Sequence, residues 1–174
     1  MTLQKTTKVL IFLTAGALTA CGDKSVEAEG SSLDLYINEF LAANDSIIAN
    51  VNGDYVDWVE LYNESEVDLS LDGFYMTDDL DEPLFHPLSA ELTVPAGGYL
   101  LLWADKESDL GDYHLPFALE KSGEQLGLSY IDDGGEPVLL DGVAFGAQET
   151  DISWGRLPDA GEWSAVTPTP GTEN

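Results

Sequence analysis

Short apolar segments separated by turn residues follow one another from about residue 35 to the end of the chain. The segment 55–62 (YVDWVELY) is typical, because the side chains of Val59 and Leu61 would face one side of a strand. Those of Trp58 and Glu60 would face the other side. This alternation predicts a strand with one face in a hydrophobic core.

Turn residues divide the apolar segments at 72–73 (DG), 95–98 (PAGG) and 132–135 (DDGG), where glycine supplies the positive φ that tight turns need. Beyond the first twenty residues, no window shows a helical stripe of ten or more residues. Many short strands with turn signals between them predict an all-β sandwich or barrel. The expected strands are 34–40, 55–62, 67–71, 74–77, 92–94, 99–104, 117–119, 125–130, 137–145 and 152–156.

The N-terminal segment has a different pattern. Lys5 and Lys8 precede an apolar run at 9–20, and the only cysteine of the chain, Cys21, follows directly. A basic start, an apolar stretch of about a dozen residues and small residues before a cut are typical of a secretory signal peptide, and the run is too short for a transmembrane helix. The residues LTAC at 18–21 resemble the lipobox of bacterial lipoproteins, in which the cysteine is lipidated and becomes the new N-terminus.

This resemblance predicts a domain organisation and a location. Residues 1–20 would be a lipoprotein signal peptide, 21–34 the lipidated cysteine and a flexible tether, and 35–174 the folded domain. Lipoproteins of this type carry three acyl chains, enough for stable anchoring in a membrane. Gly22 follows the cysteine where an Asp would favour retention in the inner membrane, so we expect the outer membrane of a bacterial envelope. Whether the domain faces the periplasm or the outside of the cell stays open.

Acidic residues dominate the charge of the chain. There are 33 Asp and Glu against 6 Lys and Arg, and removal of residues 1–20 leaves four basic residues and a net charge of −29. Such a chain lacks the basic clusters that bind phosphate backbones, so we expect no nucleic-acid partner. Its 17 aromatic residues and 44% hydrophobic content are enough for a folded core. With one cysteine, neither an intrachain disulfide nor a thiolate zinc site can form.

Two acidic loop clusters are candidate calcium sites. Calcium prefers six to eight oxygen ligands from flexible acidic loops, although neither cluster has EF-hand spacing. A solvated acidic loop is the alternative for each, and an unchanged melting temperature at millimolar calcium would contradict the metal site. The candidate ligands are Asp78, Asp79, Asp81 and Glu82 in one cluster and Asp132, Asp133 and Glu136 in the other.

Catalytic chemistry finds little support in the residues. No serine lies in a Gly-x-Ser-x-Gly elbow, and His86 and His114 have no histidine partner at metal-site spacing. With 33 acids, close carboxylate pairs occur by chance, so none of them indicates a glycosidase. We therefore expect no catalytic residues, no enzyme activity and no cofactor other than calcium.

A set of short motifs then occurs in a fixed order over nearly the whole expected domain. These motifs are 37–40 (INEF), 57–63 (DWVELYN), 67–70 (VDLS), 72–78 (DGFYMTD), 94–100 (VPAGGYL), 103–105 (WAD), 126–128 (LGL), 143–146 (VAFG), 153–156 (SWGR) and 167–171 (TPTPG). Together they resemble the lamin tail domain family. The resemblance implies an immunoglobulin-like β-sandwich that serves as a structural or interaction module.

Several of these residues have a predicted structural role. Trp58, Trp103 and Phe145 are large enough to fill the core between two sheets. Arg156 is the only arginine, and we expect it to form an ion pair with Glu39 or Glu60.

The resulting hypothesis is a lipid-anchored envelope domain without catalytic activity, which binds a protein or an envelope polymer through its loops or sheet edges. The candidate loops are 43–54, 78–89 and 106–114. Two alternatives remain open. One is a calcium-dependent adhesion or carbohydrate-binding module, and the other is a minimal hydrolase with an unrecognised carboxylate site.

Overall fold

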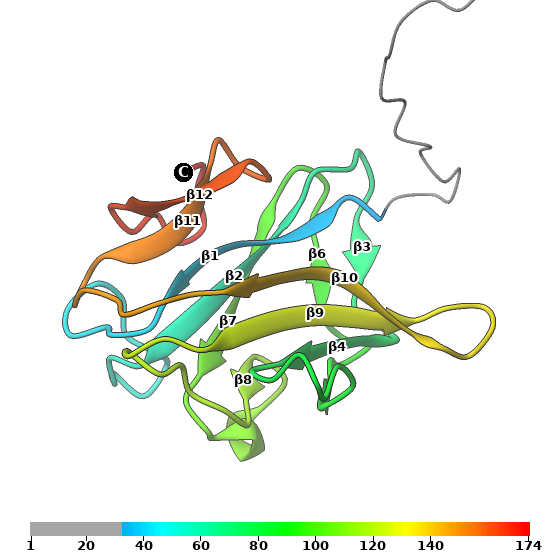
Figure 1. Cartoon of the computed structure of the whole chain (residues 1–174), viewed down its shortest axis with the longest axis horizontal. Coiled ribbons are helices and arrows are strands. Elements are labelled where there is room, and N and C mark those ends of the chain that lie inside the picture. The colour runs from blue at the N-terminus through cyan, green and yellow to red at the C-terminus, as the bar shows by residue number, and fades with distance from the viewer. Residues whose placement is uncertain (1–32) are drawn as a thin grey trace, which may run out of the picture. The chain divides into compact units, whose positions relative to one another are not determined.

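The computed structural model describes residues 33–174, so the predicted signal peptide, Cys21 and nearly all of the predicted tether lie outside the described residues. The described part is all-β, with one short 3-10 turn, η1 (Ser108–Leu110) (Figure 1). The strands are β1 (Leu35–Leu41), β2 (Asp57–Asn63), β3 (Leu69–Ser70), β4 (Phe74–Thr77), β5 (His86–Pro87), β6 (Thr93–Val94), β7 (Tyr99–Ala104), β8 (His114–Leu115), β9 (Gln125–Ile131), β10 (Pro137–Ala144), β11 (Ser153–Leu157) and β12 (Glu162–Val166).

Two main sheets form the sandwich. The larger has six strands in the order β12-β11-β1-β2-β7-β8, and the smaller has four in the order β10-β9-β4-β5. Strands β3 and β6 form a separate two-stranded sheet. Neighbouring strands are antiparallel except for β7 and β8, which are parallel. An all-β sandwich is therefore confirmed.

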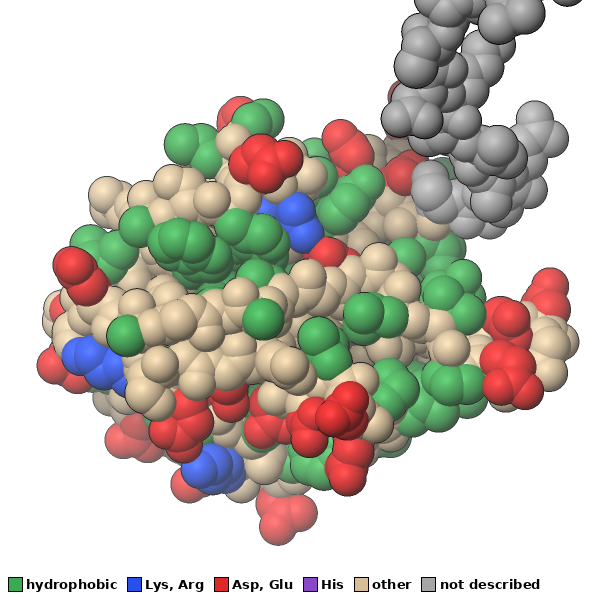
Figure 2. Space-filling model, viewed as in Figure 1, with side chains coloured by type: hydrophobic (Ala, Val, Ile, Leu, Met, Phe, Trp, Pro, Cys, Tyr) green, Lys and Arg blue, Asp and Glu red, His purple; other side chains and the backbone are tan. Residues whose placement is uncertain are grey.

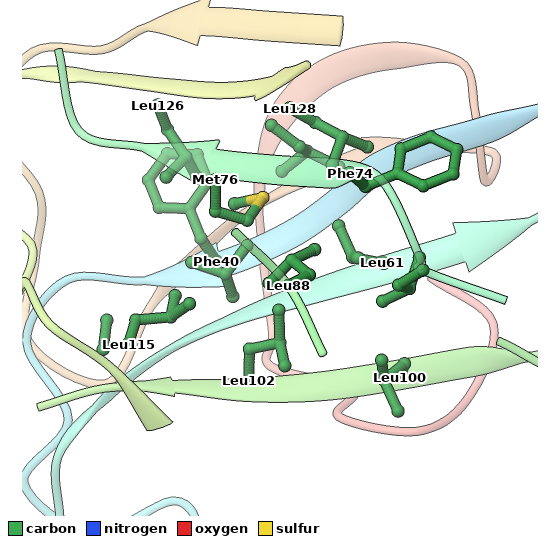
Figure 3. Packing of buried hydrophobic residues seen from close by; sticks show 14 of the residues in the cluster. Phe40, Leu61, Phe74, Met76, Leu88, Leu100, Leu102, Leu115, Leu126 and Leu128 are labelled. Atoms are coloured by element: carbon green, nitrogen blue, oxygen red, sulfur yellow. The ribbon is translucent and has the colours of Figure 1, made fainter. Parts of the chain in front are cut away.

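The hydrophobic core lies between the two sheets (Figure 3). From the larger sheet, Leu61 and Leu102 point toward the smaller one, which contributes Met76 and Leu128. All four side chains are buried, as the alternation along 55–62 predicted for Leu61. Phe145 also belongs to this core and packs against Phe40, with 4.5 Å between the ring centroids.

The other face of the larger sheet carries a second, smaller hydrophobic cluster. Trp58, Trp103 and Leu41 form it, and Ile48 and Val56, from the segment between β1 and β2, pack against it. The prediction that Trp58 and Trp103 fill the core between the sheets was therefore wrong. The tryptophans alternate with core residues along β2 and β7, so they face outward and are buried by a loop instead.

Most predicted strands are present, and the errors concern very short or late ones. Residues 117–119 are not a strand, and only Ala118 makes an isolated bridge, with Asp105. The two-residue strands β5 and β8 have too little length to leave a pattern in the sequence. Strand β12, which pairs with β11, was also missed.

Asn63 is fully buried at the end of β2 and holds three neighbouring segments together. Its side-chain nitrogen donates to the carbonyl oxygens of Val67, Val94 and Pro95 at 2.8, 3.1 and 3.2 Å. Its side-chain oxygen accepts from the backbone N–H and the hydroxyl of Ser65. The amide therefore satisfies backbone groups that no strand reaches.

We expect Asn63→Ala to lower the free energy of unfolding by about 2–4 kcal/mol, because it leaves buried carbonyl groups without a donor. Urea unfolding measures this loss. Asn52→Ala is the control, since Asn52 is exposed and its side chain makes no hydrogen bond in the described part of the chain. Equal stability of the two variants would contradict the role assigned to Asn63.

Candidate functional site

Arg156 on β11 joins the two sheets. Its Nη2 lies 2.8 and 3.0 Å from the carboxylate oxygens of Asp141 on β10, which belongs to the other sheet. Its Nε donates to the backbone oxygen of Ile37 at 2.9 Å, and its Nη1 donates to the backbone oxygen of Gly161 at 2.7 Å. The guanidinium carbon also lies 4.6 Å from the centroid of the Trp163 ring, a cation–π contact.

The predicted ion pair of Arg156 therefore exists, but the predicted partner was wrong. Glu39 and Glu60 lie on the outer face of the larger sheet, whereas Asp141 reaches Arg156 from the smaller sheet. Asp141 also accepts a hydrogen bond from the backbone N–H of Ile37, beside a bulge in β1. The carboxylate of Asp141 thus accepts hydrogen bonds both from the β1 backbone and from the guanidinium of Arg156.

Glu39 and Glu60 are directly opposite each other on β1 and β2, and both are fully buried. The C-terminal tail covers them. Thr169 donates its backbone N–H and its hydroxyl to Glu39, and the hydroxyl of Ser153 donates to Glu39 as well. The backbone N–H of Gly171 donates to Oε2 of Glu60 at 2.5 Å, while the buried Oε1 has no hydrogen-bond partner.

Burial raises the pKa of both carboxyl groups. The pKa of Glu60 rises to about 8, because desolvation outweighs the hydrogen bond from Gly171 and because Glu39 and Asp159 add negative charge nearby. The pKa of Glu39 rises for the same main reason, desolvation, which the bonds from Ser153 and Thr169 partly offset. Because the two carboxyl groups lie side by side, ionisation of one disfavours ionisation of the other. Glu60 is therefore mostly protonated at neutral pH.

Asp159 completes the polar cluster under the tail. It accepts hydrogen bonds from the side-chain nitrogen of Asn38, from the hydroxyl of Tyr99 and from the backbone N–H of Asn174. Desolvation and the bond to Asp159 raise the pKa of Tyr99. Glu39, Glu60 and Asp159, the shielded acids, thus all accept hydrogen bonds from donors of the same chain.

The two acidic loop clusters use some of their carboxylates as turn caps. Asp79 accepts the backbone N–H of Asp81 at 2.9 Å, and Asp132 accepts those of Gly134 and Glu136, each at 2.9 Å. Among residues 33–174, no three His, Cys, Asp or Glu side chains form a group that could hold a metal ion. Calcium binding by either cluster stays a prediction.

The two histidines line one small hollow of about 110 Å³, together with Ser89 and Ser108. His114 is buried, and its Nδ1 lies 2.7 Å from a carboxylate oxygen of Asp105. This pair would orient a general base, but within the described residues no serine hydroxyl hydrogen-bonds to His114. The arrangement lacks the contact that activates a nucleophile.

A larger hollow of about 370 Å³ opens on the surface between the loop after β4 and the turn end of the β9–β10 hairpin. It is lined by Pro83, Leu84, Phe85 and Pro137, with Glu82 at its border. The hollow thus lies beside both acidic clusters that the sequence analysis singled out.

A family model described as Lamin Tail Domain matches residues 28–154. The chain belongs to the lamin tail domain family. The match covers β1 to β10 and the first residues of β11, and it ends before the 167–171 motif. A comparison with curated proteins and a comparison with solved structures each gave no match. The lamin tail domain is an immunoglobulin-like, non-enzymatic domain family.

The family match ends before Arg156, Asp159 and the tail. Sequence reasoning identified Arg156 but missed its partner Asp141, and it also missed Asp159, Thr169 and Gly171. The signals for the tail were the 167–171 motif and its Pro170-Gly171 turn, which say nothing about the strands that the tail covers. Among the described residues, no helix combines the length and the apolar character needed to cross a bilayer.

Arg156→Lys should lower the free energy of unfolding by about 2–3 kcal/mol, because a lysine cannot bond to Asp141, Ile37 and Gly161 together. Thermal and urea unfolding measure the loss. Lys106→Arg, at an exposed position, is the charge-conserving control. An unchanged melting temperature for Arg156→Lys would refute the proposed role of the guanidinium.

The raised pKa of Glu60 predicts a pH-dependent stability. With a pKa of 4.5 when unfolded and about 8 when folded, this group stabilises the fold fully below pH 4.5, and the contribution is lost as pH rises to about 8. The wild type should lose stability relative to Glu60→Gln as pH rises, so the difference in the free energy of unfolding should grow by a few kcal/mol from pH 5 to pH 9. Urea unfolding at several pH values gives the difference, with Glu66→Gln, an exposed site, as control. A difference that does not change with pH would argue against a protonated Glu60.

Proposed function

We propose that this lamin tail domain is a lipid-anchored, non-catalytic interaction module of a bacterial envelope. One observation carries the non-catalytic part: the shielded acids Glu39, Glu60 and Asp159 serve the fold, since each is bound by donors of the chain's own strands and tail. Buried carboxylates of a hydrolase need a reactant within reach, whereas these lie under Thr169 and Gly171.

The anchoring part rests on the sequence of the N-terminal segment. A basic start, an apolar run and LTAC at 18–21 support lipidation at Cys21, followed by outer-membrane sorting with Gly22 after the cysteine. An anchored domain works at the membrane surface, where tethering raises its local concentration toward any envelope partner. Its strongly negative charge keeps the domain off anionic lipid headgroups and nucleic acid.

Expression of the full chain in a Gram-negative bacterium tests the anchor. We expect the chain in the outer-membrane fraction, with Cys21 as the N-terminal residue carrying a diacylglycerol and an amide-linked fatty acid in the mass spectrum. Cys21→Ala should be absent from the outer-membrane fraction, carry no fatty acid and keep the signal segment uncut. A mature chain that begins elsewhere and carries no fatty acid would overturn the anchoring proposal.

A further inference from the structure

The outer face of the smaller sheet presents an apolar surface to solvent. Leu126 and Leu128 of β9 are buried in the core, so the alternate residue Ile131 lies on the other side of that strand. Ile131 is 42% exposed, Leu139 on β10 is 48% exposed, and Phe85 is 46% exposed. Phe85 and Pro137, the cross-strand partner of Ile131, also line the 370 Å³ hollow. The face therefore combines exposed apolar side chains with a concave site.

Leu80 fixes the acidic loop over this face. A Cβ atom placed on Gly127 would lie 2.6 Å from Cδ2 of Leu80, and one on Gly142, its cross-strand partner, 3.4 Å from the same atom. The two glycines thus leave room for the leucine side chain on the sheet. The backbone N–H of Leu80 donates to Gln125 at 3.0 Å, and Thr77 bonds to both backbone groups of Asp79. The loop is therefore preorganised rather than loosely attached.

Acidic side chains border this face on two sides. Figure 2 shows them on the tip of the β9–β10 hairpin and on the loop after β4, with hydrophobic side chains between. The ion pairs in the described part of the chain are His114–Asp105 and Arg156–Asp141, so none of these acids has a cationic partner. The side chains of Asp81, Glu82 and Asp133 are not needed as turn caps and remain available.

We propose that the outer face of the β10-β9-β4-β5 sheet docks a protein segment that presents an apolar side chain flanked by Lys or Arg. This inference deepens the proposed interaction function and rests on it. The hollow at Pro83, Phe85 and Pro137 accepts the apolar anchor, and the acidic borders attract the flanking cations. Hot spots of protein interfaces are apolar anchors in pockets with a polar rim, and this surface has that composition.

The charge and the arrangement of the border carboxylates favour a cationic peptide over two other ligands, an anionic membrane surface and a divalent cation. An anionic membrane surface would be repelled by the carboxylates. A divalent cation would need several carboxylates converging on one point, and no such group exists among residues 33–174. A cationic peptide needs no convergence, because each Lys or Arg can meet a separate carboxylate.

Binding of a defined probe tests the proposal. The full chain in a neutral detergent is titrated with a fluorescein-labelled peptide, Gly-Lys-Lys-Phe-Leu-Lys-Lys-Gly, and anisotropy reports binding. Two control peptides replace the lysines by Glu or the Phe-Leu pair by Ser-Ser. We expect saturable binding of the first peptide only, weakened by salt. Hydrogen-exchange mass spectrometry should place the protection at residues 78–85 and 131–139.

Variants then separate the two parts of the site. Leu139→Ser should weaken binding by about fivefold or more through lost apolar contact. The double variant Asp81→Asn, Glu82→Gln should weaken it by several-fold and reduce its salt dependence. Val51→Ser, at an 86% exposed position, is the apolar control, and Asp54→Asn with Glu66→Gln is the charge-matched control.

Several results would overturn the proposal. These are the absence of saturable binding up to millimolar peptide, equal binding of the control peptides, equal weakening by the control variants, and protection at other segments. Protection of residues 78–82 by millimolar calcium alone would assign the acids to a cation and would also overturn it. None of these results depends on Cys21, so failure here is distinct from failure of the anchoring experiment.

Discussion

Strand β11 pairs with only part of β1, and a single ion pair satisfies the backbone groups of Ile37 that β11 does not reach. Strand β1 pairs with β11 at Glu39 and Phe40. At Ile37 the backbone N–H donates to Asp141 instead, and the backbone oxygen accepts from Arg156. Since Asp141 and Arg156 come from opposite sheets, their contact closes the sandwich along this edge. In a chain with so few cations, this guanidinium has no substitute.

Alternation along the strands was sufficient to predict the core of the sandwich but not what covers its outer faces. Val59 and Leu61 were assigned correctly because period-two patterning depends only on local geometry. Trp58 and Trp103 were assigned to the wrong layer, because their size indicates burial without indicating which layer buries them. The loop that covers them, 42–56, has no apolar periodicity that would reveal this role.

The partners in the polar clusters could not be predicted for a related reason. Arg156 was recognisable as the only arginine, but its choice of Asp141 depends on the position of a bulge and on the register between sheets. Asp79 and Asp132 were recognised as parts of acidic loops, and their local role as turn caps follows from short-range geometry. Neither observation reveals that the two loops border one apolar face, which only the pairing of β9 with β4 and β10 brings about.

The bonds from the tail to the first strand have a consequence for the order in which the chain acquires its structure. Thr169 and Glu39 are 130 residues apart in sequence, and Arg156 is separated from Ile37 by 119. During ribosomal synthesis β1 emerges early, yet its final partners emerge last. The nascent polypeptide therefore cannot complete its fold prematurely, and contacts of such long sequence separation make folding slow. A late-closing topology of this kind leaves β1 without its long-range hydrogen-bond partners until nearly all of the described residues have been synthesised.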